Sequence, residues 1–557
     1  MLRRYVFCGT FHGLAPSRRY LAPCPKEPGL SSVVTNDGGD YLADSYLLSR
    51  LLYPARRIGA AVILTQTTVI LITLVAYKLV LIGIGVWASR RVHSATDFLL
   101  GGRGLGPWVA GLSYAASTSS AWVLLGYSGF VYAFGLSALW MVPGIWAGYV
   151  VMWPWFGPRI RGESAAQGWV TPTEFLTASL DRQAAARIAA LAAGLIGFCF
   201  IFYIAAQFAA AATAFTTNFA MSNTSSLLLG AGIVLIYCLL GGFWAASVTD
   251  TLQAVIMMLV AVLVPALAVV AAGGPGQILA NVSAIGGDFA SASGGHAGLL
   301  FLGMLLGFAG IGLGTLGQPH LLARLMAVKG ERERRLGFLI AFGWGVTVYI
   351  GMTWMALAAR SLTPDLPGGE QVFYLLAEPL LPPVLAGIVI AAILSAVMST
   401  VDSLLLAASA AVSHDLRLAE RFGVSDLAMS RGVMTAIVVG AVTLALVLPD
   451  TIFNRVLFAW NALGAAFGPI IVARVMKREP PAAARFWSIV TGFGLTVIFY
   501  LGGTMDASSA SGVSRIIADL AQLPGDPFER VVPFLPPLAM LFLWPQPAVA
   551  AAQSEAG

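Results

Sequence analysis

Two apolar stretches decide the fold, because each carries helix-weakening residues near its middle. The first reads Ser-Tyr-Ala-Ala-Ser-Thr-Ser-Ser-Ala-Trp over residues 113–122, and the second runs from Gly307 to Pro319 with five glycines and a final Gly-Gln-Pro. Irregular backbone inside a bilayer leaves polar groups unpaired, so it persists only where it lines a cavity or is buried in protein. A pair of such spans in matching positions of two halves is typical of a transporter's substrate and ion site.

The composition predicts an all-α polytopic membrane protein. The 557 residues are 58% hydrophobic and 10% charged, whereas a soluble globular domain carries about 25% charged residues. The cysteines and histidines show no disulfide or metal-ligand spacing, and no nucleophile–base pair or phosphate-binding loop indicates an enzyme. At about 20 apolar residues per span, we expect about 13 transmembrane helices, at residues 66–89, 107–133, 136–158, 184–216, 223–241, 246–273, 298–326, 336–360, 383–413, 427–448, 453–473, 485–504 and 531–545.

Basic residues in the predicted loops indicate the orientation. With the start of the first helix outside, most loop Lys and Arg residues fall on the inner side, among them Arg324, Arg474 and Arg485, and few fall outside, among them Arg455. This asymmetry predicts an amino end outside and a carboxyl end in the cytoplasm. We expect a basic, disordered extension or a start site assigned too early at 1–60, a membrane domain at 61–548 and a short cytoplasmic tail at 549–557.

The spans divide into two groups of five when the first helix and the last two are set aside. Helices 2–6 and 7–11 then form two halves, and the interrupted spans come first in each. Because five is an odd number, the second group crosses the membrane in the opposite sense to the first. The count therefore predicts an inverted 5+5 repeat around the two interrupted helices.

Several motifs resemble the sodium:solute symporter family. They are Asp-Phe-Leu-Leu-Gly-Gly-Arg at 97–103, Gly-Gly-Phe-Trp at 241–244, Gly-Gln-Pro-His-Leu-Leu-Ala-Arg at 317–324, Ala-Val-Met-Ser-Thr at 396–400 and Gly-Ala-Ala-Phe-Gly-Pro at 464–469. The resemblance implies a leucine-transporter-type fold and Na⁺-coupled symport of a small organic solute, such as proline or a related amino acid, by alternating access. It implies Na⁺ as a co-transported ion, no cofactor, and no partner beyond solute, ion and bilayer; no feature indicates nucleic acid.

The same resemblance implies a sodium site between helices 2 and 9. Backbone carbonyls and hydroxyls suit a hard cation at an unwound helix. The residues at the matching positions are Ala116, Ser119, Ala396, Ser399 and Thr400. From the residues alone, an adjacent Ser-Thr pair can equally serve close helix packing.

Three further residues bear on coupling and charge. Thr118 stands where proline-transporting members of the family have an essential Asp, which removes a negative charge from the site. Asp402 is an intramembrane carboxylate and hence a functional candidate; we hypothesise that it restores the missing charge, the alternative being a bond to neighbouring hydroxyls. Asp250 opens helix 6, where it is either a coupling residue or an N-terminal cap.

The substrate site is expected between helices 2, 4 and 7. Tyr203 and Gln207 lie one turn apart on helix 4, and Trp122 follows the first interruption. On helix 7, Ile311 and Thr315 replace two aromatic residues of proline-transporting members, whereas Pro319 keeps a family proline. The alternative for the aromatic residues is ordinary packing.

Two other functions remain open from the sequence. A proton-coupled symporter of the same fold would use Asp402 as its titrating group, and a transporter-like solute sensor would share the fold without net transport. Lys78, inside the first helix and outside the repeat, must snorkel or find a partner. We expect a structural role for it.

Overall fold

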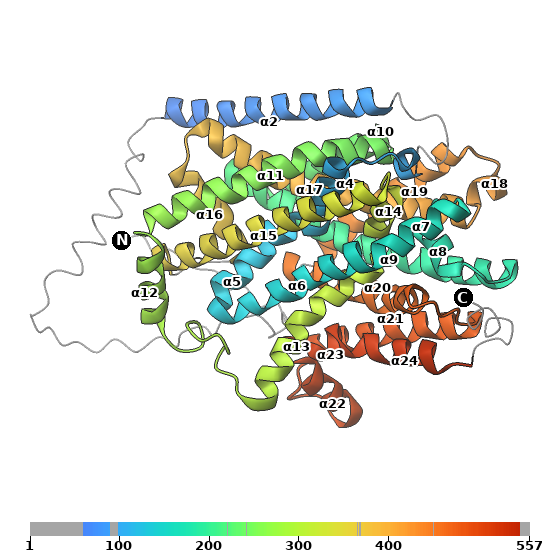
Figure 1. Cartoon of the computed structure of the whole chain (residues 1–557). Helices are drawn as coiled ribbons and strands as arrows, with labels where there is room; N and C mark the ends of the chain where they lie inside the picture. The colour runs from blue at the N-terminus through green and yellow to red at the C-terminus, as the bar shows by residue number, and fades with distance from the viewer. Residues whose placement is uncertain are drawn as a thin grey trace, which may run out of the picture.

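The computed structural model describes residues 60–89, 99–219, 221–240, 242–364, 366, 369–448 and 451–545. These residues form helices that run side by side in one bundle, with α2 (Ala60–Ser89) along its edge (Figure 1). Within the described ranges there is no strand, and one isolated bridge joins Leu105 to Val328. The predicted all-α fold is confirmed.

The first predicted half forms helices in the expected order. Its members are α4 (Pro107–Ala121), η4 (Trp122–Tyr127), α5 (Ser128–Phe134), η5 (Gly135–Trp140), α6 (Met141–Val150), η6 (Val151–Phe156), α9 (Arg182–Phe219), α10 (Asn223–Leu240) and α11 (Phe243–Ala271). Short helices α7 (Gly157–Gln167) and α8 (Pro172–Thr177) lie between η6 and α9, and α12 (Pro275–Ile285) follows α11.

The second half and its flanks complete the bundle. The second half consists of α13 (Gly298–Gly314), η7 (Thr315–Gly317), α14 (Pro319–Ala327), α15 (Glu331–Leu362), α16 (Val372–Leu380), α17 (Pro383–Ser409), η9 (Ala410–Asp415), α18 (Leu418–Phe422), α19 (Asp426–Val447) and α20 (Ile452–Val475). After it come α21 (Ala482–Thr504), α22 (Gly512–Ala521), α23 (Pro527–Arg530), η10 (Val532–Phe534) and α24 (Leu535–Leu543).

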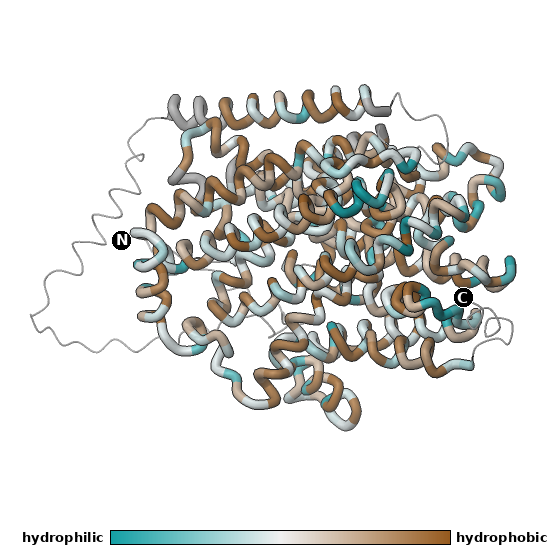
Figure 2. The backbone as a smooth tube through the Cα atoms, viewed as in Figure 1, coloured by the Kyte–Doolittle hydropathy of each residue, from teal (hydrophilic) through white to brown (hydrophobic). Residues whose placement is uncertain are grey.

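All thirteen predicted spans coincide with helices. Ten described helical stretches are long and apolar enough to cross a membrane, and one of them, Pro107–Gln167, joins the second and third predicted spans. The described apolar part of α10 is shorter, at Asn223–Ile236, and the last predicted span is the nine-residue α24. Apolar residues dominate the tube in Figure 2, as a lipid-facing bundle requires.

The helix contacts between the two halves occur in equivalent pairs, as the predicted inverted repeat requires. The first member of each half packs on the second member of the other, as α4 on α15 and α13 on α6. The third member of each half packs on the last member of the other, as α9 on α20 and α17 on α11. The two halves therefore interlock around the interrupted spans, which places both interruptions inside the bundle.

Four arginines that the sequence analysis assigned to loops are buried instead. Arg324, Arg455, Arg474 and Arg485 are each at most 3% exposed. At the bundle end that holds α8, Arg485 donates to the Leu176 and Ala178 carbonyls. These arginines thus act as packing and hydrogen-bonding groups, a role that loop counting does not detect.

Candidate functional site

The first interrupted span breaks at Ser120, one residue before the end of α4. Its backbone lies at φ 50° and ψ −171°, a region that residues other than glycine occupy at a cost of about 1–3 kcal/mol. Side chains replace the lost helical bonds: the Gln207 amide oxygen accepts from the Ala121 N–H at 3.1 Å, and the Ser120 hydroxyl accepts from the Trp122 N–H at 3.0 Å. Gln207, predicted as a substrate residue, therefore supports the break from α9.

The second interrupted span breaks between η7 and α14. Gln318 is extended, with φ −81° and ψ 111°, and α14 restarts at Pro319, which has no N–H to pair. The Gln318 amide donates to the carbonyls of Gly314 and Trp460, each at 2.9 Å, and the Trp460 indole donates to the Ile311 carbonyl at 2.9 Å. A side chain at Gly314 would meet the Trp460 ring at 2.0 Å. Helix α20 thus closes directly over the break.

The predicted sodium residues lie together where α4 meets α17. Ala116, Ser119, Ala396, Ser399 and Thr400 are fully buried. The two helices are joined beside them by a hydrogen bond of 3.0 Å from the Ser117 hydroxyl to the Ser399 carbonyl. Within the described ranges, the hydroxyl oxygens of Ser119 and Thr400 have no hydrogen-bond partner. A buried polar atom without a partner is unfavourable by about 1–3 kcal/mol, so an oxygen-seeking cation suits this position.

A buried ion pair contacts α4 and α17 through Ser113 and Ser403. Arg324 of α14 donates to an Asp250 carboxylate oxygen at 2.8 Å, and both side chains are at most 2% exposed. Ser113 of α4 bridges them, accepting from Arg324 and donating to Asp250, each at 2.8 Å. The cap role for Asp250 is wrong, because α11 begins at Phe243 and Asp250 lies about two turns inside it. Its second carboxylate oxygen has no partner.

Asp402 is a second buried carboxylate near the same cluster. It is 2% exposed, and one of its oxygens accepts from the Ser403 hydroxyl at 3.1 Å. Its other oxygen has no hydrogen-bond partner among the described residues. The single hydroxyl hydrogen of Ser403 is shared between Asp402 and the Ser399 carbonyl, which lies 2.6 Å away, and the same hydroxyl oxygen accepts from Arg324. One chain of contacts therefore joins Asp402, the predicted sodium helix and the ion pair.

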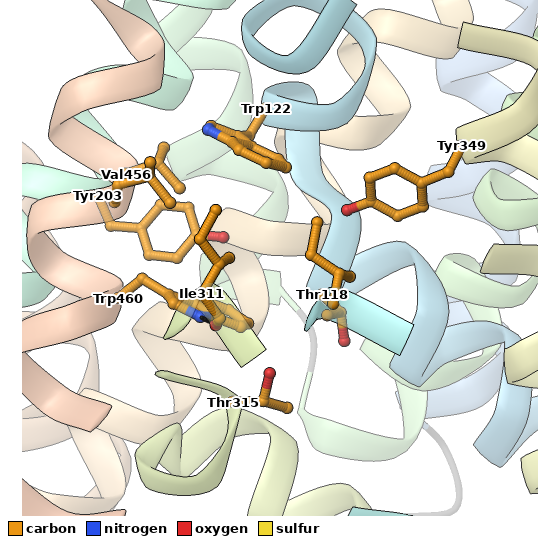
Figure 3. A pocket seen from close by; sticks show the side chains of 10 residues that line it. Thr118, Trp122, Tyr203, Ile311, Thr315, Tyr349, Val456 and Trp460 are labelled. Carbon is orange, nitrogen blue, oxygen red and sulfur yellow. Dashed lines mark hydrogen bonds between the residues drawn. The ribbon is translucent and has the colours of Figure 1, made fainter. Parts of the chain in front are cut away.

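A narrow pocket, with a cavity volume of about 20 Å³, lies beside the first break. Figure 3 shows the hydroxyls of Tyr203 and Tyr349 directed into it from opposite sides, with Thr118 between them. The Thr118 hydroxyl donates to the Tyr114 carbonyl at 2.7 Å. The lining residues are Thr118, Trp122, Ile145, Tyr203, Ile311, Thr315, Tyr349, Val456, Leu457 and Trp460.

The pocket brings together five of the predicted residues. They are Thr118, Trp122, Tyr203, Ile311 and Thr315, whereas Gln207 and Pro319 do not line it. Sequence reasoning missed Tyr349 on α15 and Trp460 on α20. No local motif marks Tyr349. Trp460 stands four residues before the Gly-Ala-Ala-Phe-Gly-Pro motif, and its position next to that motif could have identified it as a site residue.

A second narrow cavity, of about 20 Å³, lies against Arg324 of the ion pair. Its lining includes His320, Arg324 and Ser403 at one end and Val170 and Pro172, next to or within α8, at the other.

Helix α8 is held in place by polar contacts. Thr171 and Glu174 form a capping box, Thr171 donates to Asp415 at 2.8 Å, and His414 lies 3.6 Å from Glu174. Burial disfavours the Glu174 carboxylate, but its hydrogen bonds with His414 and with the Thr171 and Val170 N–H groups outweigh burial and hold its pKa below the usual value. These contacts fasten α8 over the second cavity.

This combination of two broken helices, an inverted repeat, buried oxygens and an enclosed pocket defines a membrane transporter. The family model described as "Sodium:solute symporter family" matches residues 98–492. The chain therefore belongs to the sodium:solute symporter family, as its motifs predicted. It is a multi-pass membrane transporter of the symporter class and not an enzyme, and Na⁺ is the co-substrate of its family rather than a bound cofactor.

Characterised relatives cover most of the chain. It is 31% identical to the high-affinity proline transporter PutP of Bacillus subtilis over 435 residues, 76% of this chain and 90% of the relative. It is 32% identical to the sodium/proline symporter of Escherichia coli over 451 residues, 78% and 88% of the two chains.

A solved transporter confirms the fold. The chain matches a Na⁺-coupled sialic acid symporter with a TM-score of 0.64 at 16% identity, over 83% of this chain and 97% of the other. At that identity the match carries the fold alone, and it agrees with the predicted leucine-transporter-type inverted repeat.

Proposed function

We propose that this protein couples the inward movement of Na⁺ to the uptake of a small organic solute by alternating access. The observation that carries the proposal is the meeting of both broken spans at one pocket. Among the described residues, the hydroxyls of Ser119 on α4 and Thr400 on α17 also have no hydrogen-bond partner. Thr118 lines that pocket and Ser119 follows it directly, so solute and ion would share the broken segment of α4. A shared segment supplies the physical link that symport needs, because occupancy of one site shapes the other.

The pocket chemistry favours a solute without net charge. None of the ten lining residues is charged, and the polar lining groups are hydroxyls and indole N–H groups. A zwitterionic amino acid fits this lining, because broken helix ends offer partial charges to its carboxylate and ammonium. We place proline among the candidates, since relatives are named for it, together with other small amino acids that suit Ile311 and Thr315.

Proton coupling is the second candidate. Asp402 has a partnerless carboxylate oxygen inside the bundle, and Thr118 supplies no charge at the pocket. In that case a proton on Asp402 would take the place of Na⁺. The two candidates differ in which ion gradient drives uptake.

We further propose that residues 61–548 form the membrane domain in the cell membrane, with the amino end outside and the carboxyl end in the cytoplasm. Hydrophilic segments gather at the bundle end that holds α7, α8 and α18 (Figure 2). This end contains Arg159, Arg161, Arg417 and Arg421, and an excess of basic residues is typical of the cytoplasmic side. The expected extension at 1–60 lies almost entirely outside the described residues, and the expected tail at 549–557 lies wholly outside them.

The test is uptake of labelled amino acids, including proline, into proteoliposomes with an imposed Na⁺ gradient, an H⁺ gradient or neither. We expect accumulation with the Na⁺ gradient that is lost in Ser399→Ala and Thr400→Ala. Ser409→Ala is the matched control, because the Ser409 hydroxyl lies on the same helix and donates to the Leu406 carbonyl at 2.9 Å. Accumulation driven by H⁺ alone would overturn the sodium assignment.

A further inference from the structure

Lys78 lies on the face of α2 that packs against the bundle. Leu74 and Leu81, one turn before and one turn after it, are 6% and 0% exposed, whereas Leu79 is 64% exposed. Lys78 is also central in the span Thr68–Trp87. About ten residues separate it from either end, which is roughly 15 Å of helix. Snorkelling to the membrane surface is therefore out of reach, and the ammonium needs a partner within the bundle.

The contacts of Lys78 lead to the helix that carries the predicted sodium residues. Its ammonium donates to the sulfur of Met398 on α17, and the neighbouring Tyr77 hydroxyl bonds to Ser395. Helices α2 and α17 also approach closely at Thr73 and Gly387, where an added side chain would lie 3.0 Å from Thr73. A thioether is a weak acceptor for an ammonium that offers three donors, so Met398 leaves Lys78 poorly satisfied.

Asp402 follows Met398 by one helical turn. Residues four apart on a helix share a face, with about 5–6 Å between their Cβ atoms, which lies within reach of a lysine side chain. Arg324 already pairs with Asp250. Among the described residues, neither Lys78 nor Asp402 has an ion-pair partner.

We propose that Lys78 is a tethered cation for Asp402, neutralising this carboxylate when the sodium site holds no ion. The inference rests on the proposed sodium site, because Asp402 lies three residues from Ser399 on α17. When Na⁺ binds there, its charge takes over the neutralisation of Asp402, and the ammonium returns to Met398. Lys78 would then compete with Na⁺ and lower the apparent affinity for the ion.

The first test is a double-mutant cycle on thermal unfolding of the purified full chain in a Na⁺-free choline buffer. Lys78→Met and Asp402→Asn are each expected to lower the melting temperature, because each leaves one charge buried without a counter-charge. The double variant is expected to regain most of the loss, since both charges are gone. Melting-temperature losses that simply add in the double variant would overturn the proposal.

Two further variants serve as controls for the double-mutant cycle. Lys329→Met removes an exposed lysine and should leave the melting temperature unchanged. Lys78→Arg keeps the cation and should melt close to the wild type. If Asp402→Asn yields no folded protein, the two Lys78 variants decide the question. An equal loss of melting temperature in Lys78→Arg and Lys78→Met would overturn the proposal, because the packing of the lysine side chain, and not its charge, would then account for its contribution to stability.

A Na⁺ titration of the melting temperature tests the competition. Lys78→Met is expected to lower the half-saturating Na⁺ concentration about tenfold, within the usual range of coupling between two sites; an unchanged value would contradict the competition. If Na⁺ stabilises neither protein, the proposed sodium coupling fails. The Na⁺-free cycle still decides whether Lys78 neutralises Asp402.

Discussion

At Ser120, where the backbone is strained, we expect glycine to give a more stable protein than alanine, which is the reverse of the order at an ordinary helical position. At a regular helical position, alanine is more favourable than glycine by about 1 kcal/mol. Ser120 has φ 50° and ψ −171°, where a Cβ atom adds about 1–3 kcal/mol of strain that glycine lacks. We therefore expect Ser120→Gly to be more stable than Ser120→Ala by about 1–2 kcal/mol.

Comparing these two variants isolates the strain, because both lose the hydroxyl that accepts from the Trp122 N–H. Ser128, the first residue of α5, is the matched control, since it is buried, has helical backbone angles and donates to the Leu125 carbonyl of the preceding η4. There alanine should be the more stable substitution. The assay is the melting temperature of the purified variants, with a gap of about 1–4 °C between glycine and alanine at position 120. Ser120→Ala melting at or above Ser120→Gly would refute the account of the break.

Three further predictions follow from buried contacts. Asp250→Asn should destabilise the protein by about 3–5 kcal/mol, because it leaves the buried Arg324 guanidinium without a counter-charge. Thermal unfolding checks this, with Asp519→Asn, at an exposed ion pair, as the control. Equal losses of stability in the two variants would contradict the prediction. Trp460→Phe removes the indole N–H that donates to the Ile311 carbonyl. It should weaken the apparent solute affinity in uptake assays about tenfold, or 1.4 kcal/mol. An unchanged affinity would contradict this prediction. Because the pKa of Glu174 is lowered, its stabilisation is complete above the unfolded value of about 4.3 and is lost at lower pH. The melting-temperature deficit of Glu174→Gln should therefore be present at pH 6 and shrink below about pH 4, and a deficit that persists there would contradict the assignment.

Hydropathy and local composition were sufficient for the fold. Apolar runs predicted every spanning helix, and the glycines around 307–319 marked the second break because they weaken a helix wherever they stand. The first break was predicted from a Ser-rich stretch, but its location at Ser120 depends on Gln207 from another helix. A contact between residues 86 positions apart leaves no local trace in the sequence.

The site was predicted only in part, for the same reason. Motif positions gave the hydroxyls of Ser399 and Thr400 on α17, which packs on α4, and their role as sodium ligands stays a prediction. The sequence analysis placed Arg324 in a loop because it follows an apolar run. Its ion-pair partner, Asp250, lies on a different helix, so the local sequence does not reveal the pair. Tyr349 and Trp460 enter the pocket through packing between the two halves, which a single sequence does not display.

The most direct test of the central claim is solute accumulation in proteoliposomes under a Na⁺ gradient, compared between the wild type and Thr400→Ala. The Thr400 hydroxyl is fully buried and has no hydrogen-bond partner in the part of the chain that the structure describes, so its removal should spare folding and act on the ion. The account predicts accumulation in the wild type and little in Thr400→Ala, with a melting temperature close to that of the wild type. Equal Na⁺-driven accumulation by both proteins would contradict it.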